Sequence, residues 1–437
     1  MVEFEELHLS EGLMHSIKDA KFDVPSEIQH KTIPLTLEGK DVIAGSATGS
    51  GKTLAFGACI LENCISGKGI QSLILTPTRE LAEQVCKSLN LFGKYKRLTI
   101  IPVYGGVGID AQIRGLRRAD VVVGTPGRIL DHCQRNTINF SKIKILVLDE
   151  ADRMLDMGFL RDVEQIIKQT PSTRQTLLFS ATISPDIINI SKHYMKHAVE
   201  VSAEVLVDPT KLEQFFYDVD SSNKFSLLVH LLKQEKSDLV LVFCNTKRNA
   251  DFVAENLNLN GINAQVTHGG LSQNQRTNVL ESFDKGRVRV LVCTDVIARG
   301  LDIKGVSHVY NYDAAKTSKE YIHRIGRTAR AGKEGKAITI IAERDYENFR
   351  NILKDYTIKI EQLATPEVER ARMRVDRRPS REDFRGRGRF GNQRTPNRES
   401  GRRSYGGNRG QNRSGRSRSS GISASHSFRR NNRNSRY

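Results

Sequence analysis

The segment Ser46–Thr53 combines the residue types that bind phosphate groups. It reads SATGSGKT, directly follows an apolar run and precedes a helical pattern. Its two glycines let a phosphate approach converging backbone N–H groups, Lys52 supplies a positive charge for the β- and γ-phosphates, and the Thr53 hydroxyl can ligate Mg²⁺. Ser46 stands where such loops usually begin with glycine, but it is also small. The segment predicts a nucleoside triphosphate site formed by Ser46, Ala47, Thr48, Gly49, Ser50, Gly51, Lys52 and Thr53.

An acidic run supplies the second half of this chemistry. The residues Asp149-Glu150-Ala151-Asp152 come immediately after the apolar run Ile145–Leu148. At the end of a buried strand, Asp149 can hold Mg²⁺, usually through water, and Glu150 can act as the general base for an attacking water. Such an acidic run is by itself more often a solvated turn. Together with the phosphate-binding segment it predicts a site that hydrolyses a nucleoside triphosphate with Mg²⁺.

A basic cluster, His323, Arg324, Arg327 and Arg330, permits two interpretations. On a helix, residues 323, 327 and 330 would share one face. A solvated basic helix face is the simpler interpretation. Because the phosphate-binding segment and the acidic run contain no arginine, the alternative is that Arg327 and Arg330 stabilise the charge that develops on the γ-phosphate.

Short apolar runs alternate with amphipathic segments through residues 1–369, and this alternation predicts the fold. Nearly continuous apolar runs are typical of parallel strands buried on both faces. In the first half we predict helices at Arg79–Phe92 and Leu160–Lys168, and strands at 41–44, 72–75, 99–103, 120–123, 143–148 and 176–179. In the second half we predict strands at 215–219, 239–243, 263–267, 288–293, 308–312 and 336–341.

Two successive series of strands and helices predict two tandem, doubly wound α/β domains, each built on a parallel sheet. The polar stretch Ser202–Lys211 separates them, so we place the first domain at 1–205 and the second at 206–365. The segment 366–437 has few large apolar residues and is filled with arginine, glycine, serine and asparagine. It cannot bury enough surface to offset chain entropy, and we predict a disordered tail.

The positive charge of the chain is concentrated in this tail. Residues 370–437 contain 21 arginines, no lysine and four acidic residues, whereas residues 1–369 contain 47 basic and 46 acidic residues. The charge indicates a polyanionic partner. Arginine stacks on bases and pairs with phosphates, and Phe390 and Tyr405 lie among the arginines, so we expect the tail to bind RNA. A tail that only keeps the chain soluble is the alternative.

The sequence does not indicate a secreted or membrane protein. The six cysteines are scattered, and no pair has the spacing of a zinc or redox motif. The N-terminal residues MVEFEELHLS are acidic, unlike a signal peptide. The apolar runs are far shorter than the ~20 residues of a membrane span. We therefore expect reduced cysteines, a cytoplasmic location and no membrane partner.

The acidic run spells the signature of the DEAD-box RNA helicases, and residues 4 to about 363 resemble that family, which implies two RecA-like domains. Phe22 with Pro25–Gln29 looks like the family's Q motif, here within residues 4–29. Further segments match in the family's order: Pro77–Leu81, Gly105-Gly106, Thr125–Arg128, Ser180–Thr182, Gln273–Arg276, Thr294–Asp302 and His323–Arg330. This many ordered matches makes the resemblance specific.

The resemblance implies roles for these segments. Phe22 would stack on adenine, Gln29 would read the adenine edge, and Asp302 would add a nucleotide contact. His323 would link Asp152 to the coupling element Ser180–Thr182, in which Ser180 and Thr182 connect hydrolysis to strand separation. The implied RNA contacts are Pro77, Thr78, Arg79, Gly106, Thr125, Arg128, Arg276 and Thr294. Such residues contact phosphates and riboses rather than base edges, so we expect little sequence specificity.

Four residues depart from the family's pattern. Lys21 and Ala329 stand where glycine is usual, Ser26 replaces threonine, and Ala47 replaces glutamine. None of these changes removes a charged or ligating group. We expect the chemistry to be retained, with a modest change in nucleotide affinity.

The expected function is that of an RNA-stimulated ATP hydrolase, an RNA helicase that opens duplexes or remodels RNA–protein complexes when ATP closes the two domains. We expect ATP and Mg²⁺ as cofactors, single-stranded and duplex RNA as partners, ribosomal or other ribonucleoprotein particles among the targets, and a monomeric chain. One alternative is a DNA helicase or translocase, which Gln29 and the acidic run argue against. The other is an ATP-gated RNA clamp with little unwinding, which would keep the same ATP site.

Overall fold

A computed structural model describes residues 3–46, 49–203, 212–234, 237–295, 305–329 and 334–374. Met1–Val375 forms one compact unit, and Asp376–Tyr437 is a separate unit. Several predictions lie outside the described residues: the contacts of Ala47, Thr48, Asp302 and Arg330, the domain boundary near 205, and the tail beyond residue 374. They stay predictions.

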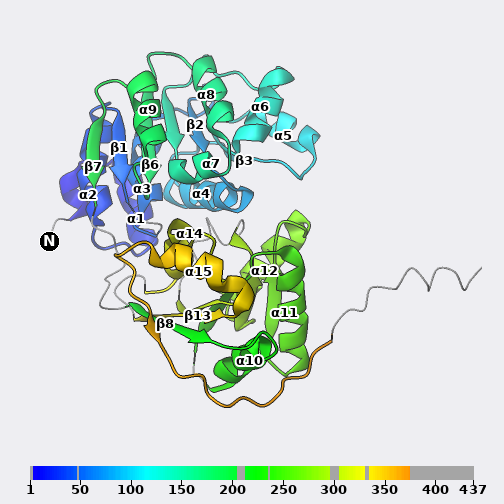
Figure 1. Cartoon of the computed structure of the whole chain (residues 1–437). Helices are drawn as coiled ribbons and strands as arrows, with labels where there is room; N and C mark the ends of the chain where they lie inside the picture. The colour runs from blue at the N-terminus through cyan, green and yellow to red at the C-terminus, as the bar shows by residue number, and fades with distance from the viewer. Residues whose placement is uncertain are drawn as a thin grey trace, which may run out of the picture. The chain divides into compact units, whose positions relative to one another are not determined.

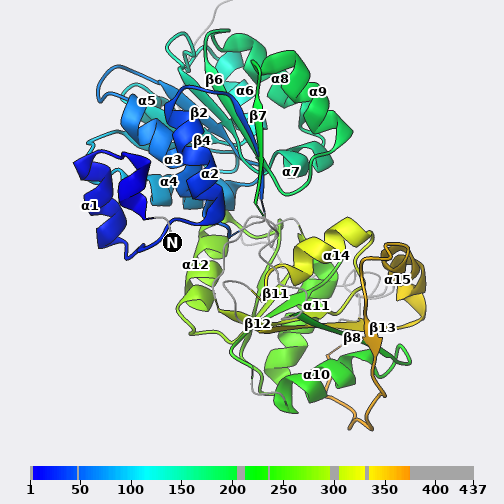
Figure 2. The ribbon, with the colours of Figure 1, turned by 90° about the vertical axis from the view of Figure 1, so that its left-hand side faces the viewer.

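The first half of the unit is a parallel seven-stranded sheet in the order β3-β4-β2-β5-β6-β1-β7. Its strands are β1 Val42–Gly45, β2 Ser72–Leu75, β3 Ile100–Val103, β4 Val121–Gly124, β5 Ile145–Leu148, β6 Gln175–Ser180 and β7 Val199–Ser202. Its helices are η1 Phe4–Leu7, α1 Glu11–Asp19, α2 Glu27–Leu37, α3 Lys52–Asn63, α4 Arg79–Phe92, α5 Ile109–Leu116, α6 Pro126–Gln134, α7 Ala151–Asp156, α8 Leu160–Gln169 and α9 Pro185–Tyr194. Helices cover both faces of the sheet (Figures 1 and 2).

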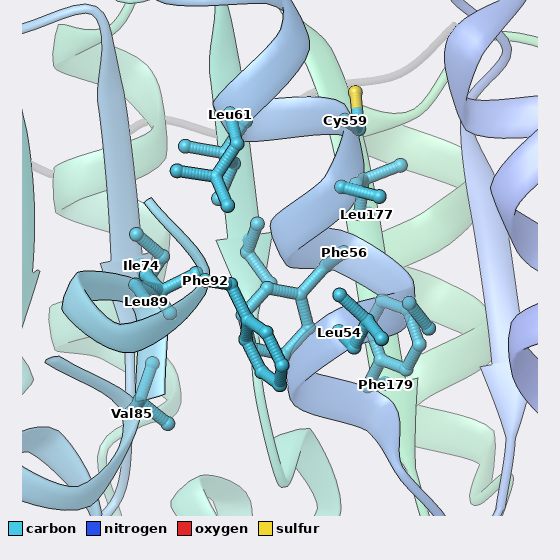
Figure 3. Packing of buried hydrophobic residues seen from close by; sticks show 14 of the residues in the cluster. Leu54, Phe56, Cys59, Leu61, Ile74, Val85, Leu89, Phe92, Leu177 and Phe179 are labelled. Atoms are coloured by element: carbon cyan, nitrogen blue, oxygen red, sulfur yellow. The ribbon is translucent and has the colours of Figure 1, made fainter. Parts of the chain in front are cut away.

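Two hydrophobic cores lie on the two faces of this sheet. One joins the strands to α1–α4, and the other joins them to α6–α9. In the first core, Phe56 of α3 packs edge-on against Phe179 of β6, with ring centroids 5.3 Å apart, beside Leu177 and Leu89 (Figure 3). Because the central strands are buried on both faces, most of their residues are apolar, as the sequence pattern predicted.

The second half has the same plan, with the parallel order β10-β11-β9-β12-β13-β8-β14. Its strands are β8 Leu212–Asp218, β9 Leu239–Phe243, β10 Ala264–Thr267, β11 Val290–Cys293, β12 Val306–Asn311, β13 Gly335–Ile341 and β14 Glu361–Gln362. Its described helices are α10 Lys224–Gln234, α11 Lys247–Leu259, α12 Gln273–Asp284, α14 Ser318–Ile325, η2 Glu343–Asp345 and α15 Tyr346–Leu353. The prediction of two tandem doubly wound domains is confirmed.

Two strands were missed by the sequence analysis, and both lie at sheet edges. β7 has only Val201 fully buried, and β14 comprises two exposed residues. An edge strand has only one neighbour and is less covered, so it lacks the continuous apolar run that marked the central strands. The predicted strands themselves are present, with ends shifted by a few residues.

The prediction that packing stops at residue 366 is wrong. Residues 366–374 run in an extended conformation along α10 and α11 and are drawn in orange in Figure 1. Val368, Ala371 and Met373 pack on the core of the second domain. Asn260, which caps the end of α11, hydrogen-bonds both the N–H and the C=O of Arg372, and Asn256 of α11 does the same for Arg374. We call residues 366–374 the C-terminal strap; three spaced apolar residues and two asparagines hold it, a pattern too short to mark an element.

Candidate active site and RNA-binding site

The carboxyl ends of three neighbouring strands gather the predicted ATP-site residues of the first domain. Ser46 follows β1, Ser180 ends β6 and Asp149 follows β5, and these strands are adjacent in the sheet. Ser46 N–H donates to the Ser180 carbonyl at 2.9 Å. Ligands of open α/β sheets bind at this edge, so the topology alone places these segments where a ligand is expected.

The phosphate-binding segment uses its glycines as the sequence suggested. Gly49 and Gly51 have φ of +87° and +91°, in the left-handed region. A Cβ on Gly51 would lie 2.4 Å from Gln29 Nε2, so no other residue fits there without displacing Gln29. Lys52 is buried at the start of α3, and its Nζ donates to the Ser46 carbonyl at 3.4 Å. The Lys52 ammonium therefore lies inside the loop that would surround the phosphates.

The Q-motif segment is attached directly to this loop. Gln29 Nε2 donates to the Gly51 carbonyl at 3.0 Å, and Ser26 Oγ donates to the Ser50 carbonyl at 2.7 Å. Ser26 N–H also donates to Gln29 Oε1, which fixes the amide orientation. Phe22 is half-buried and packs edge-on against Phe92. The serine that replaces threonine at position 26 keeps its hydroxyl contact with the loop.

Asp149 is the group that best fits a metal ion. It is buried, and its Oδ1 has no hydrogen-bond partner among the described residues. Burial raises the pKa of Asp149 to about 6, against the attraction of Lys52. A buried carboxylate oxygen without a partner is costly unless a ligand satisfies it. A hydrated Mg²⁺ between Asp149 and the half-buried Thr53 would supply that partner.

Glu150 lies in an unusual backbone conformation and forms a buried ion pair. Its φ of 52° and ψ of 50° are left-handed, at the N-cap of α7. Its carboxylate is paired with Arg153 three residues later. Burial opposes ionisation of Glu150, but the positive charges of Arg153, Lys52 and Arg327 outweigh it and lower its pKa. Glu150 is therefore an ionised carboxylate held by an arginine that the sequence analysis did not consider.

Asp152, Ser180 and Thr182 form one hydrogen-bonded cluster. The hydroxyl and N–H of Thr182 both donate to Asp152 Oδ2, at 2.9 and 3.1 Å. Asp152 N–H donates to Ser180 Oγ, which in turn donates to the Thr182 carbonyl at 2.7 Å. Burial raises the pKa of Asp152, but Lys52 and the Thr182 hydrogen bond lower it further than burial raises it. The cluster links the end of β6 to the first turn of α7.

The basic cluster of the second domain differs from the predicted helix face. α14 ends at Ile325, followed by Gly326, so His323 lies in its last turn and Arg327 lies beyond it. Arg327 is buried, and its Nε donates back to the His323 carbonyl at 3.2 Å. Residues 323 and 327 therefore do not share the face of one helix, and the buried Arg324 and Arg327 do not form a solvated basic face.

Arg324 has a structural role that the charge pattern did not indicate. It is 1% exposed and binds Asp295 through both Nε and Nη2, at 2.6 and 2.7 Å. It also donates to Asn245 Oδ1 and to the Asp313 carbonyl. Its guanidinium lies 5.2 Å from the centre of the Phe243 ring. Arg324 thus fixes α14 to the ends of three strands.

Most of the predicted RNA contacts line a cavity of about 520 Å³; Gly106 is not among its lining residues but adjoins Arg79, which is. A Cβ on Gly106 would lie 1.9 Å from Arg79 Nη1, so the glycine makes room for that guanidinium. Arg128 Nη1 donates to the Val107 carbonyl and to Gln112 Oε1, both at 3.3 Å. Of the predicted residues, Pro77, Thr78, Arg79, Thr125, Arg128 and Arg276 line the cavity.

Further residues at this cavity were not predicted. Glu80 Oε1 accepts a hydrogen bond from Arg276 Nη1 at 2.5 Å, and both side chains are buried. Met157 and Phe159 also line the cavity. Thr294 is buried directly after β11 but is not among the lining residues. No feature of the sequence alone marks Glu80, because its partner is 196 positions away.

Comparison with known proteins identifies the same two domains. The DEAD/DEAH box helicase family matches residues 26–190, and the helicase conserved C-terminal domain matches residues 223–332. The DEAD-box ATP-dependent RNA helicase CshA of Geobacillus kaustophilus is 44% identical over 375 residues, which cover 85% of this chain and 80% of the relative. CshA of Bacillus subtilis is 43% identical and covered to 76%.

Solved structures agree with these relatives. Saccharomyces cerevisiae Dbp5 bound to RNA and ADP-BeF3 is 32% identical with a TM-score of 0.74, covering 83% of this chain and 96% of that one. A DEAD box protein from Methanococcus jannaschii is 42% identical with a TM-score of 0.52, covering 83% of this chain and 99% of that one. With its two α/β domains and the residues at their strand ends, the chain belongs to the DEAD-box ATP-dependent RNA helicase family.

Proposed function

We propose that this protein is an RNA-stimulated ATP hydrolase that separates short RNA duplexes or remodels RNA–protein complexes. The observation that carries the proposal is the cluster of buried charges, Lys52, Asp149, Glu150 and Asp152, at the carboxyl edge of the first sheet. Burying this many charges without a ligand is expensive, and a triphosphate with its metal ion would satisfy them.

Each residue has a chemical role in the proposed reaction. Gln29 and Phe22 hold the adenine, and Lys52 binds the β- and γ-phosphates. Mg²⁺, held by Thr53 and by Asp149 through water, would neutralise phosphate charge. Glu150 accepts the proton of the attacking water. Arg327 and Arg330 stabilise the charge of the transition state, an effect of order 10³–10⁵ in rate in other phosphoryl-transfer enzymes.

The coupling to RNA uses the cluster of Asp152, Ser180 and Thr182. Asp152 is two residues after Glu150, and Thr182, which follows β6, holds the Asp152 carboxylate. A shift of β6 would therefore move Asp152 and, through it, the hydrolytic residue Glu150. RNA lies along Arg79, Gly106 and Arg128, where guanidinium and backbone groups contact phosphates without reading bases. If ATP and RNA each favour the same arrangement of the domains, each raises the affinity of the other.

We also propose a monomeric protein of the cytoplasm that acts on ribonucleoprotein particles. The free thiols support a reducing compartment: all six cysteines are unpaired, and burial raises the pKa of Cys86 to about 11. No helix in the described part of the chain is long and apolar enough to cross a membrane.

The proposal is tested by two measurements on the full chain. ATP hydrolysis should rise severalfold or more when single-stranded RNA is added and should require Mg²⁺. Release of a labelled strand should be faster from a short RNA duplex than from the DNA duplex of the same sequence. RNA-stimulated hydrolysis without strand release would instead support the ATP-gated clamp, and stimulation by DNA alone would exclude an RNA helicase.

A further inference from the structure

The proposed hydrolytic reaction does not account for Arg153. Its Nη1 donates to Glu150 Oε2, and the two side chains are 3% and 6% exposed. Water therefore screens this ion pair very little. Arg153 therefore binds the same carboxylate, that of Glu150, which would have to accept a proton from water.

The local sequence dictates this contact. Glu150 is the N-cap of α7 and Arg153 is the third residue of the helix, so the two are separated by three positions and face the same side. Long side chains on a helix point back toward its N-terminus, which directs the guanidinium to Glu150. Ala151 and Met154 pack in the core and fix the helix. The contact lies wholly within the first domain.

This contact has a consequence for catalysis. A general base must have an oxygen free to accept a hydrogen bond from the attacking water. In this structure Oε2 of Glu150 is occupied by Arg153. A water bound to Glu150 in this orientation meets a carboxylate whose charge is partly neutralised by Arg153, so Glu150 is a weaker base there than after it turns away.

Glu150 has alternative positive partners. Lys52 and Arg327 both act on its carboxylate. If Glu150 leaves Arg153, these charges prevent it from becoming an uncompensated buried anion, which would otherwise be strongly unfavourable. Lys52 belongs to the phosphate-binding segment and Arg327 to the second domain, so both can respond to bound ligands.

We propose that Arg153 is a positioning residue that holds Glu150 in a resting orientation and keeps ATP hydrolysis slow until RNA binds. This inference rests on the proposed function, in which Glu150 is the general base. A hydrogen bond to a charged group contributes enough to change a rate by about tenfold, which sets the size of the expected effect.

The test compares the full chain with Arg153→Met, which removes the guanidinium but preserves a long apolar side chain. Without RNA, kcat for ATP hydrolysis should rise about tenfold, because Glu150 is no longer held. At saturating RNA, kcat should change less than about twofold, because Glu150 is already released there. The stimulation ratio, which is kcat at saturating RNA divided by kcat without RNA, should fall accordingly. Arg153→Lys, which retains a positive charge, should restore most of the ratio.

Arg174→Met is a matched control. Arg174 is also a buried arginine of the first domain, and it donates to the carbonyls of Pro171 and Tyr194. Its loss should lower the unfolding temperature without changing the stimulation ratio. If Arg153→Met unfolds, Arg153→Gln gives the same comparison with a polar side chain.

Three results would overturn the inference. A parallel fall of both rates in Arg153→Met would mean that Arg153 holds Glu150 in its productive orientation. An unchanged stimulation ratio would mean that the ion pair does not restrain Glu150. If RNA does not stimulate the unaltered chain at all, the proposed function itself fails, and the role of Arg153 fails with it.

Discussion

In the first domain, Lys52, Glu150 and Asp152 lie in turns or first helical turns that follow strands, whereas in the second domain His323 lies in the last turn of helix α14 and Arg327 lies just beyond it. In the first domain the strand ends place the charges, and short local contacts from Arg153 and Thr182 orient Glu150 and Asp152. The second domain holds its helix through Arg324, a buried arginine with three kinds of partner. The comparison suggests that mutations at the first set act on chemistry and that mutations at the second act first on stability.

The largest expected effect is on turnover in the first domain. Glu150→Gln should lower kcat by about 10²–10⁴-fold while ATP still binds, because only the proton acceptor is lost. Lys52→Ala should also stop turnover but should weaken ATP binding, because a phosphate partner is lost. Single-turnover hydrolysis and fluorescent-nucleotide titration separate the two variants. Equal loss of ATP affinity in both would contradict these roles.

The next effect is on the stability of the second domain. Arg324→Met should cost about 3–5 kcal/mol of unfolding free energy, because it removes a fully buried guanidinium together with its ion pair to Asp295 and its hydrogen bonds to Asn245 and the Asp313 carbonyl. Urea unfolding of the full chain, followed by a probe in the second domain, measures the loss. The exposed Arg344, whose Nη2 contacts Asp313 at 3.0 Å, provides the control: Arg344→Met should cost less than about 1 kcal/mol. Similar losses in both variants would remove the distinction between the domains.

A smaller effect is expected at the RNA surface. In Gly106→Ala the added methyl group must displace the Arg79 guanidinium. Alanine is also strained at this position, because the backbone φ of +83° is left-handed. We expect RNA affinity to fall about tenfold, as for the loss of one charge-assisted contact, with ATP affinity unaffected. Gly108→Ala, next to open space, is the control. Fluorescence anisotropy with labelled RNA distinguishes them, and equal affinities would refute the steric argument.

The smallest effects concern the two positions where glycine is usual in the family. Lys21 and Ala329 have φ of 58° and 53°, which explains that preference. Lys21 is exposed, so Lys21→Gly should stabilise the first domain by about 0.5–1 kcal/mol through relief of strain. Ala329 is buried, and loss of its methyl should offset the same relief, leaving Ala329→Gly near neutral. Thermal unfolding measures both, and a destabilised Lys21→Gly would contradict the strain argument.

The sequence was sufficient to predict the central strands and helix α4. Continuous apolar runs mark buried strands, and a strong amphipathic period marks a helix that is buried on one side. It also predicted that the phosphate-binding segment and the acidic run form one site, and the structure places both at the carboxyl edge of the first sheet. β7 and β14 were missed because edge strands need little apolar surface. The roles proposed for the site residues remain predictions.

Two kinds of feature could not be predicted from the sequence: the exact residue at which a helix ends, and which of several arginines contacts a given carboxylate. α14 ends at Ile325, before Arg327, and Gly326 has an ordinary φ of −65°, so no left-handed glycine cap marks this end in the sequence. Arg324 and Arg327 are equally basic in the sequence, yet Arg324 is the one whose guanidinium spans Asp295, Asn245 and the Asp313 carbonyl. The pairing of Glu150 with Arg153 was readable in principle from their spacing, but a residue after an acidic run is as often solvated.

The C-terminal strap affects where a protease can cleave the chain and where the chain can be truncated without damage to the second domain. Trypsin cleaves after arginine and lysine residues, and Arg370 and Arg372 are exposed. Their peptide bonds nevertheless lie in backbone that is hydrogen-bonded to Ser226 and Asn260, and a protease must pull such a segment free before it can cleave. Limited trypsin digestion should therefore spare these two bonds. A chain shortened at residue 365 would lose Val368, Ala371 and Met373 from the core, whereas one ending after Arg374 keeps the second domain whole and removes only the remaining arginine-rich residues.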